Sequence, residues 1–258
     1  APRPSGLAER AKLASAQALA LGRMLLLPPD SNTVLKGELG TQKRVAWSEP
    51  AGLDPIKSAC RRQGVKLNDL LVAALTGALA RFLEEHGRID GLELRALVPV
   101  YVRDASAGDE LENHFGLVYV SLPIAVRDRG ERLRQLHQSF ESIKAQPDAV
   151  VALGVLGALG VASTEIEHIG IQLFTRKASV MITNVPGPPV EIHLTGSALS
   201  EMLVWAPVSG QIGVGLSLLS YAGQVRLGVA ADARRLPDPR VLVRFYEEEL
   251  AALTSTAG

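Results

Sequence analysis

Apolar residues recur at every third or fourth position in seven stretches of this chain, a spacing that predicts helices. One stretch differs from the rest. Residues 70–80 are apolar on nearly every side, so the helix that contains them should be buried all round. Gly64 and the Pro28-Pro29 pair end two of the patterns, as helix-stopping residues do. The predicted helices cover residues 7–27, 53–63, 69–86, 130–145, 148–161, 165–177 and 239–253.

Shorter apolar runs, some with strict alternation, predict strands between these helices. The clearest is a hairpin around Ala222-Gly223, where Val225, Leu227 and Val229 alternate with polar or small residues. The polar, glycine-containing stretch 30–40 is interpreted as a linker. Long strands interleaved irregularly with helices indicate an α/β fold of the α+β type, a mixed β-sheet covered by helices. The predicted strands cover residues 42–48, 94–102, 115–124, 179–185, 190–195, 199–205, 213–221 and 224–230.

Composition and charge narrow the classes of function. The 258 residues include 27 basic and 27 acidic side chains and only 4% aromatic residues, which argues against a nucleic-acid partner. The single cysteine, Cys60, excludes an internal disulfide, fits a reducing, cytoplasmic compartment and is expected to be a packed thiol. No apolar run approaches the roughly 20 residues that span a bilayer. The chain begins Ala-Pro-Arg-Pro without methionine, which favours a processed product or a piece of a longer protein.

The patterns that suggest independent catalysis do not hold. His86 opens a match to His-x-x-x-Asp-Gly, in which histidine is a general base, but Glu85 precedes it and the segment ends a helix. We expect instead a solvated histidine at the negative end of that helix. The glycines at 154, 157 and 160 lack dinucleotide spacing and predict close helix packing. No metal or other cofactor is expected, because the remaining histidines show no metal-ligand spacing: His114, His137, His168 and His193.

Two polar positions stand beside apolar elements. Asn68 and Asp69 lie at the head of the buried helix, where Asn68 can cap the helix and Asp69 can complement its positive end. The same residues can equally bind a polar substrate group inside the protein, and spacing alone leaves both readings open. The stretch 180–189, Val-Met-Ile-Thr-Asn-Val-Pro-Gly-Pro-Pro, predicts a buried strand that is sharply ended after Asn184.

These motifs, in their order, resemble the C-terminal half of bacterial wax ester synthase/diacylglycerol acyltransferases. The similarity runs from about Asn32 to Ala252. It is carried by Leu67-Asn68-Asp69 with Gly77-Ala78-Leu79, Arg95-Ala-Leu-Val-Pro-Val100 with Arg103, Asn113-x-Phe115-Gly116, Thr183-Asn-Val-Pro-Gly-Pro188, Ser220-Tyr221-x-Gly223 and Ala231-Asp232.

The resemblance implies one half of the two-half coenzyme A-dependent acyltransferase fold, with a tunnel between the halves. In the intact enzyme acyl-CoA would acylate a long-chain alcohol or diacylglycerol, and the catalytic His-His-x-x-x-Asp-Gly belongs to the first half. Residues 1–30 would be the crossover helix and linker from that half, and residues 31–258 the C-terminal domain. No catalytic residue is therefore expected in this chain, with Asn68 and Asp69 supporting the active centre. The implied substrate-binding and CoA-side residues are Asn184, Pro186, Gly187, Gly213, Gly215, Ser217, Ser220 and Tyr221.

One strand face is a specific candidate for the acyl tunnel. Gly213, Gly215 and Ser217 share a face that is too small to fill a core layer, and strand glycines often mark close approach of a ligand or backbone. A helix packed directly on this face is the alternative. The expected partners are the N-terminal half, acyl-CoA, the acyl acceptor and a peripheral membrane or lipid-body surface. A non-catalytic lipid- or partner-binding module is the competing hypothesis for the chain as a whole.

Overall fold

The computed structural model describes residues 15, 18–19, 21–101, 115–144, 151–152, 163–208 and 210–255. Most of the helix predicted at 148–161, with its glycines, lies outside the described residues, as do His114 and the first part of the helix predicted at 7–27. Residues 21–26 of that first helix are helical.

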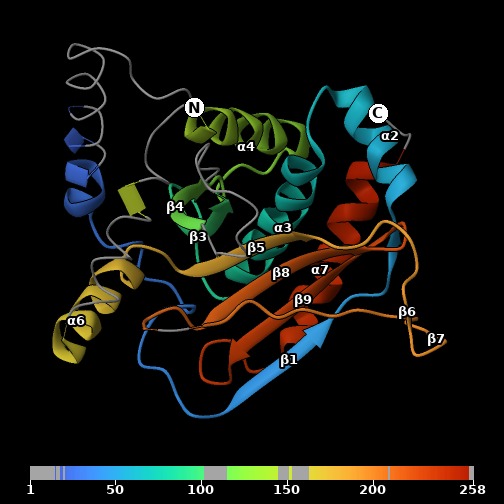
Figure 1. The fold of residues 1–258 in the computed structure, drawn as a ribbon. Helices are drawn as coiled ribbons and strands as arrows, with labels where there is room; N and C mark the ends of the chain where they lie inside the picture. The colour runs from blue at the N-terminus through green and yellow to red at the C-terminus, as the bar shows by residue number, and fades with distance from the viewer. Residues whose placement is uncertain are drawn as a thin grey trace, which may run out of the picture.

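A mixed sheet forms the centre of the molecule (Figure 1). Strand β5 (Val180–Pro186) lies between β8 (Val214–Tyr221) and β3 (Leu94–Tyr101) and is parallel to both, whereas the outer pairs are antiparallel. The short β2 (Ala51–Gly52) also pairs with β9. The sheet order is β1 (Lys43–Trp47), β9 (Gln224–Asp232), β8 (Val214–Tyr221), β5 (Val180–Pro186), β3 (Leu94–Tyr101) and β4 (Phe115–Leu122). The predicted mixed sheet is therefore confirmed.

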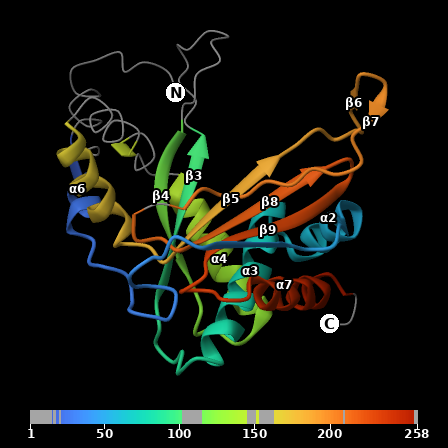
Figure 2. The same ribbon diagram turned by 90° about the horizontal axis from the view of Figure 1, so that it is seen from below.

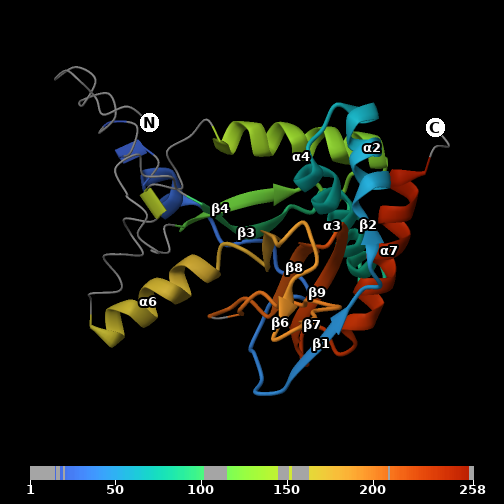
Figure 3. The same ribbon diagram turned by 45° about the vertical axis from the view of Figure 1, so that its right-hand side comes forward.

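Helices gather on one face of this sheet, with α3 (Leu67–Glu84) at their centre (Figure 2). It contacts α2 (Leu53–Gln63), α4 (Arg129–Lys144) and α7 (Pro239–Thr254). Residues 69–80 of α3 are all buried, which confirms the helix predicted to be buried on every side. Helix α6 (Thr164–Thr175) stands apart at the other end of the sheet, and only Thr175 of it is buried (Figure 3).

Element boundaries that were predicted from turn-forming residues agree with the structure. Helix α2 has the predicted limits, and Gly64 closes it with φ of 67° in the left-handed region. The β8–β9 hairpin turns at Ala222 and Gly223, whose φ angles of 46° and 77° are those of a tight type I′ turn.

Two predicted strands are wrong. Within 190–195 only β6 (His193–Leu194) is a strand, and it pairs with β7 (Ser197–Ala198) in a short hairpin. Residues 199–205 form no strand. Their apolar pattern reflects packing: residues 204–208 lie across the sheet and contact Gly215 and Gly228, without joining a ladder of hydrogen bonds.

The predicted linker 30–40 has no regular structure but is firmly docked. The buried Asp30 carboxylate accepts hydrogen bonds from the Arg95 amide at 3.0 Å and from the Ser179 hydroxyl at 2.6 Å. Further back, Lys177 Nζ donates to the Met24 carbonyl at 2.6 Å. The segment before β1 is thus attached to the N-terminal ends of β3 and β5. The proposed domain boundary at residue 30 stays a prediction.

Candidate functional site

The two polar positions singled out in the sequence meet in the structure. Asn184 Nδ2 donates a hydrogen bond to Asn68 Oδ1 at 3.1 Å. Alternation along β5 explains this contact: Val180 and Ile182 point into the core beneath the helices, and Asn184 continues the same face beyond it. Asn184 therefore reaches the head of α3, where both amides are accessible to a ligand.

The helix start differs from the prediction in one respect. Asn68 is not the N-cap, because α3 begins at Leu67 and Lys66 precedes it. The capping contact belongs to Asp69, whose Oδ2 accepts the Lys66 amide at 3.1 Å. The Asn68 side chain is thus not needed to satisfy the helix terminus. This favours the ligand-facing reading of Asn68 over the capping one.

The buried Asp69 pairs with a half-buried histidine, a contact that the sequence did not reveal. Its Oδ2 lies 2.6 Å from Nδ1 of His137 on α4, and the carboxylate itself is 1% exposed. Its second oxygen, Oδ1, is buried and has no hydrogen-bond partner among the described residues. His137 is one of the scattered histidines, and its distance of 68 positions along the chain gave no signal of the pairing. The pair fixes the α3 head to α4.

Beyond Asn184, the chain stays beside β8. Pro186 is the last residue of β5 and lies opposite Ser220, and the Gly187 amide donates to the Ser220 carbonyl at 2.9 Å. A Cβ on Gly187 would collide with that same carbonyl oxygen, so this position requires glycine. These three predicted binding residues thus lie together, two residues from the Asn68–Asn184 contact.

The Tyr221 hydroxyl is engaged by the backbone. It donates to the Leu199 carbonyl at 2.7 Å and accepts from the Ile192 amide at 3.0 Å, and the side chain is buried. It therefore holds the base of the β6–β7 excursion. A substrate contact by this hydroxyl would need to replace one of these bonds.

The small-residue face of β8 is covered by chain. A Cβ on Gly215 would lie 2.5 Å from the Ala206 carbonyl oxygen, and the buried Ser217 hydroxyl donates to the Val204 carbonyl. Gly213 precedes β8 and faces Arg235. The covering element is the segment 204–208, not a helix. A tunnel along this face would require that segment to move, so the packing alternative is the better account of the glycines.

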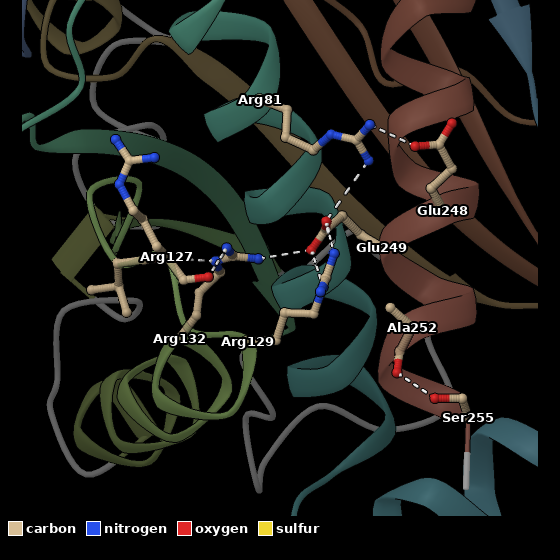
Figure 4. Close-up of polar contacts among 9 residues, drawn as sticks. Arg81, Arg127, Arg129, Arg132, Glu248, Glu249, Ala252 and Ser255 are labelled. Atoms are coloured by element: carbon tan, nitrogen blue, oxygen red, sulfur yellow. Dashed lines mark hydrogen bonds and ion pairs between the residues drawn. The ribbon is translucent and has the colours of Figure 1, made fainter. Parts of the chain in front are cut away.

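A buried cluster of charges lies beneath α3 (Figure 4). Glu249 of α7 accepts hydrogen bonds from Arg129 at 2.8 and 3.0 Å and from Arg132 at 3.0 Å. Nη1 of Arg81, on α3, lies 3.8 Å from Glu249 Oε1. Burial alone would raise the pKa of Glu249, but the hydrogen bonds from the two α4 arginines outweigh it and hold that pKa below its ordinary value. The cluster joins three helices through one carboxylate.

Among the described residues, no group of three histidine, cysteine, aspartate or glutamate side chains could hold a metal ion. Over the same residues, no helix is both long and apolar enough to cross a membrane. Cys60 is buried, which confirms the expected packed thiol.

Known proteins resemble this chain in sequence and in structure. The profile of the WS/DGAT C-terminal domain matches residues 111–254. A Mycobacterium tuberculosis protein named "Probable diacyglycerol O-acyltransferase tgs1" is 27% identical over 228 residues, which is 86% of this chain and 49% of that protein. The chain spans about half the length of the curated relatives it matches, from 45% to 54%.

Two solved structures share the fold. One is the wax ester synthase/diacylglycerol acyltransferase from Marinobacter aquaeolei VT8, with a TM-score of 0.66 and 22% identity over 93% of this chain and 56% of that one. The other is the TRI3 trichothecene 15-O-acetyltransferase from Fusarium sporotrichioides, with a TM-score of 0.64 and 15% identity over 98% of this chain and 55% of that one. The mixed sheet and its helices thus have the coenzyme A-dependent acyltransferase fold. Since the profile match covers more than half of the 258 residues, the chain belongs to the WS/DGAT C-terminal domain family.

Proposed function

We propose that this chain is the C-terminal half of an acyl-CoA-dependent O-acyltransferase that makes wax esters or triacylglycerol. The contact between Asn68 and Asn184 is the observation that supports it most directly. The two amides come from two separate motifs of the family resemblance, 116 positions apart, and converge at one accessible point. Family membership indicates the class of reaction, and the contact between the two asparagines indicates where on this chain the substrate would bind.

The reaction would proceed between the two halves of the enzyme. The hydroxyl oxygen of a long-chain alcohol or diacylglycerol attacks the thioester carbonyl carbon of acyl-CoA. A C–O bond forms, the C–S bond breaks, and the hydroxyl proton passes to the histidine of the His-His-x-x-x-Asp-Gly motif in the N-terminal half before protonating the CoA thiolate. Asn68 and Asn184 would orient the polar group of a substrate, and Asp69, held by His137, would fix the α3 head.

Exposed apolar side chains support a further partner surface. Ile166, Ile169 and Leu173 of α6 are 56%, 66% and 39% exposed, and their i, i+3, i+7 spacing places them on one side of the helix. An apolar stripe on a helix that stands apart from the core is typical of an interface. We propose that this surface binds the N-terminal half. We also propose that the enzyme is cytoplasmic and acts at a lipid surface.

The test uses the enzyme with both halves present. Asn68→Ala and Asn184→Ala should each lower kcat for CoA release from palmitoyl-CoA and hexadecanol by about tenfold, the equivalent of one hydrogen bond lost in the transition state. Gln42→Ala is the matched control, because Gln42 is an exposed amide that directly precedes the edge strand β1. This variant should retain wild-type rates. Unchanged kcat in both asparagine variants would refute the placement of the site.

A second measurement addresses the catalytic base. This chain without the N-terminal half should show no turnover in the same assay, because the histidine motif proposed to supply the base belongs to that half. Sustained turnover by the chain alone would overturn the assignment of the base to the other half. Binding of lipid without turnover by the two-half protein would favour the non-catalytic module.

A further inference from the structure

A cleft lies at the opposite end of α3 from the asparagine pair. It has a volume of about 380 Å³ and is formed by residues 32–34 and Lys36, the last turn of α3 with the loop that follows, and Arg235. Helix α3 has 18 residues, so its two ends are about 27 Å apart. The cleft is therefore separate from the site proposed for acyl transfer.

The cleft is lined by positive charge. Lys36, Arg88 and Arg235 line it together with His86, and none of the described residues of its wall is an aspartate or a glutamate. Arg235 has no ion pair within 4 Å in the described part of the chain. A concave surface with one sign of charge concentrates ligands of the opposite sign.

Two polar groups of the wall have unused hydrogen-bonding capacity. Arg235 Nε and the Thr33 hydroxyl are buried, and neither has a hydrogen-bond partner among the described residues. The Arg235 guanidinium is nevertheless fixed, because its Nη1 donates to the Lys36 carbonyl at 2.7 Å. Buried donors without partners are uncommon in folded proteins and call for a ligand, an ion or water.

His86 presents one ring nitrogen to this region. Its Nδ1 lies 2.7 Å from the Phe82 carbonyl and therefore carries a proton, and its ring lies against that of Phe82, with the ring centroids 4.4 Å apart and the planes tilted by 39°. The ring is thereby oriented, and Nε2 has no hydrogen-bond partner in the described structure. His86, whose sequence motif the acyl transfer reaction does not use, is thus placed as a wall residue of the cleft.

The existing contacts leave the charge of the cleft largely uncompensated. Lys36 Nζ donates to the Arg176 carbonyl at 2.5 Å, which is a neutral acceptor. Arg88 lies 3.2 Å from Asp90, but the two side chains are 90% and 63% exposed, and such surface pairs contribute little. Burial lowers the pKa of Lys36, and the charges of Arg95 and Arg176 lower it further against the opposing effect of Asp30. An anion bound beside Lys36 would relieve this repulsion.

We propose that this cleft binds a phosphate group, with Lys36, Arg235 and His86 as its contacts. Phosphate offers several acceptor oxygens and a double negative charge, which match a fixed guanidinium, an ammonium and an imidazolium whose Nε2 carries the second proton better than a carboxylate does. The phosphate belongs either to a soluble molecule or to a lipid headgroup, because both present the same chemistry to the cleft.

Calorimetric titration of the full chain with pyrophosphate tests the binding. Lys36→Gln and His86→Gln should each weaken the affinity about tenfold or more, as expected for a lost charge-assisted hydrogen bond. Arg61→Gln, an exposed arginine on α2, is the charge-matched control and should bind as the wild type does. Thermal unfolding checks that each variant is folded; if Lys36→Gln is not, the exposed His86 carries the test. No pyrophosphate binding, or binding that neither variant weakens, would overturn the proposal.

The source of the phosphate is resolved by two further probes. Displacement of pyrophosphate by CoA, with the same sensitivity to His86→Gln, would support a nucleotide phosphate. Flotation with phosphatidic acid vesicles but not phosphatidylcholine vesicles, reduced by His86→Gln and by added pyrophosphate, would support a lipid headgroup. Because neither readout measures turnover, failure of this proposal is distinct from failure of the acyltransferase assignment.

Discussion

Replacing Gly77 by alanine should destabilise the folded chain, although alanine ordinarily stabilises a helix. Gly77 lies in the middle of α3, directly over the buried charge cluster. A Cβ at this position would collide with Arg132 Nη1 and would lie 2.5 Å from Glu249 Oε2 and 2.9 Å from its Cδ. All three atoms belong to one buried ion pair, so the methyl group can enter only if that pair separates.

The magnitude follows from two opposing terms. Alanine is favoured over glycine in a helix interior by about 1 kcal/mol. Separating a buried ion pair costs about 3–5 kcal/mol. The lower value applies here, because Arg129 is 49% exposed and Arg132 keeps hydrogen bonds to the carbonyls of Val126 and Arg127. The difference is a net loss of about 2 kcal/mol, or a fall in Tm of about 4–8 °C for a domain of this size.

Urea unfolding followed by circular dichroism measures this change. Gly130→Ala is the matched control: it lies in the first turn of α4, and its added Cβ would meet Asp128 Oδ1 at an ordinary 3.4 Å. The control should be neutral or slightly stabilising. In a Glu249→Ala background the same Gly77→Ala change should cost at least about 1 kcal/mol less, since part of the obstruction is gone. A Gly77→Ala variant as stable as the wild type would refute the reasoning.

Three further predictions concern the same fold. Glu249→Gln should lower the free energy of unfolding near neutral pH. The difference from the wild type should shrink as the pH falls below about 4.3 and through the depressed pKa of folded Glu249, because the carboxylate then loses its charge. Urea unfolding at several pH values measures this difference, and a constant difference would contradict the prediction. Tyr221→Phe should release the Ile192 amide, cost about 1–2 kcal/mol and speed proteolysis within 188–199, whereas unchanged cleavage would count against it. Gly187→Ala should lower Tm through its collision with the Ser220 carbonyl; an unchanged Tm would mean that this turn adapts freely.

The sequence predicts local elements of this fold well, because local chemistry sets them. Helix α2 ends at Gly64 and the β8–β9 hairpin turns at Gly223, both positions where positive φ favours glycine. The strand predicted at 199–205 fails for a different reason. Its apolar residues are there because the segment covers the sheet, and burial alone does not specify hydrogen bonding to a neighbouring strand. The order of strands depends on long-range contacts that no local pattern contains.

The candidate site divides in the same way. Asn68 and Asn184 could each be found as polar residues at the end of an apolar element, but their contact depends on how β5 lies beneath α3. The partners of Glu249 are scattered from Arg81 to Arg132, and each looks in sequence like a charged residue on a solvated helix face. Only packing of three helices around one carboxylate makes them a cluster.

The cluster and the asparagine pair are connected through the register of α3. Apolar contacts on a helix that is buried on every side distinguish poorly between neighbouring registers, since leucine and alanine pack at many offsets. A slip by one residue would move Asn68 by about 1.5 Å along the axis and about 100° around it, which would break its 3.1 Å contact with Asn184. The same slip would place a side chain, in place of Gly77, against Arg132 and Glu249. We infer that the glycine and the buried charges fix the register that the apolar surface leaves loose, and thereby hold the head of α3 where Asn184 can reach it.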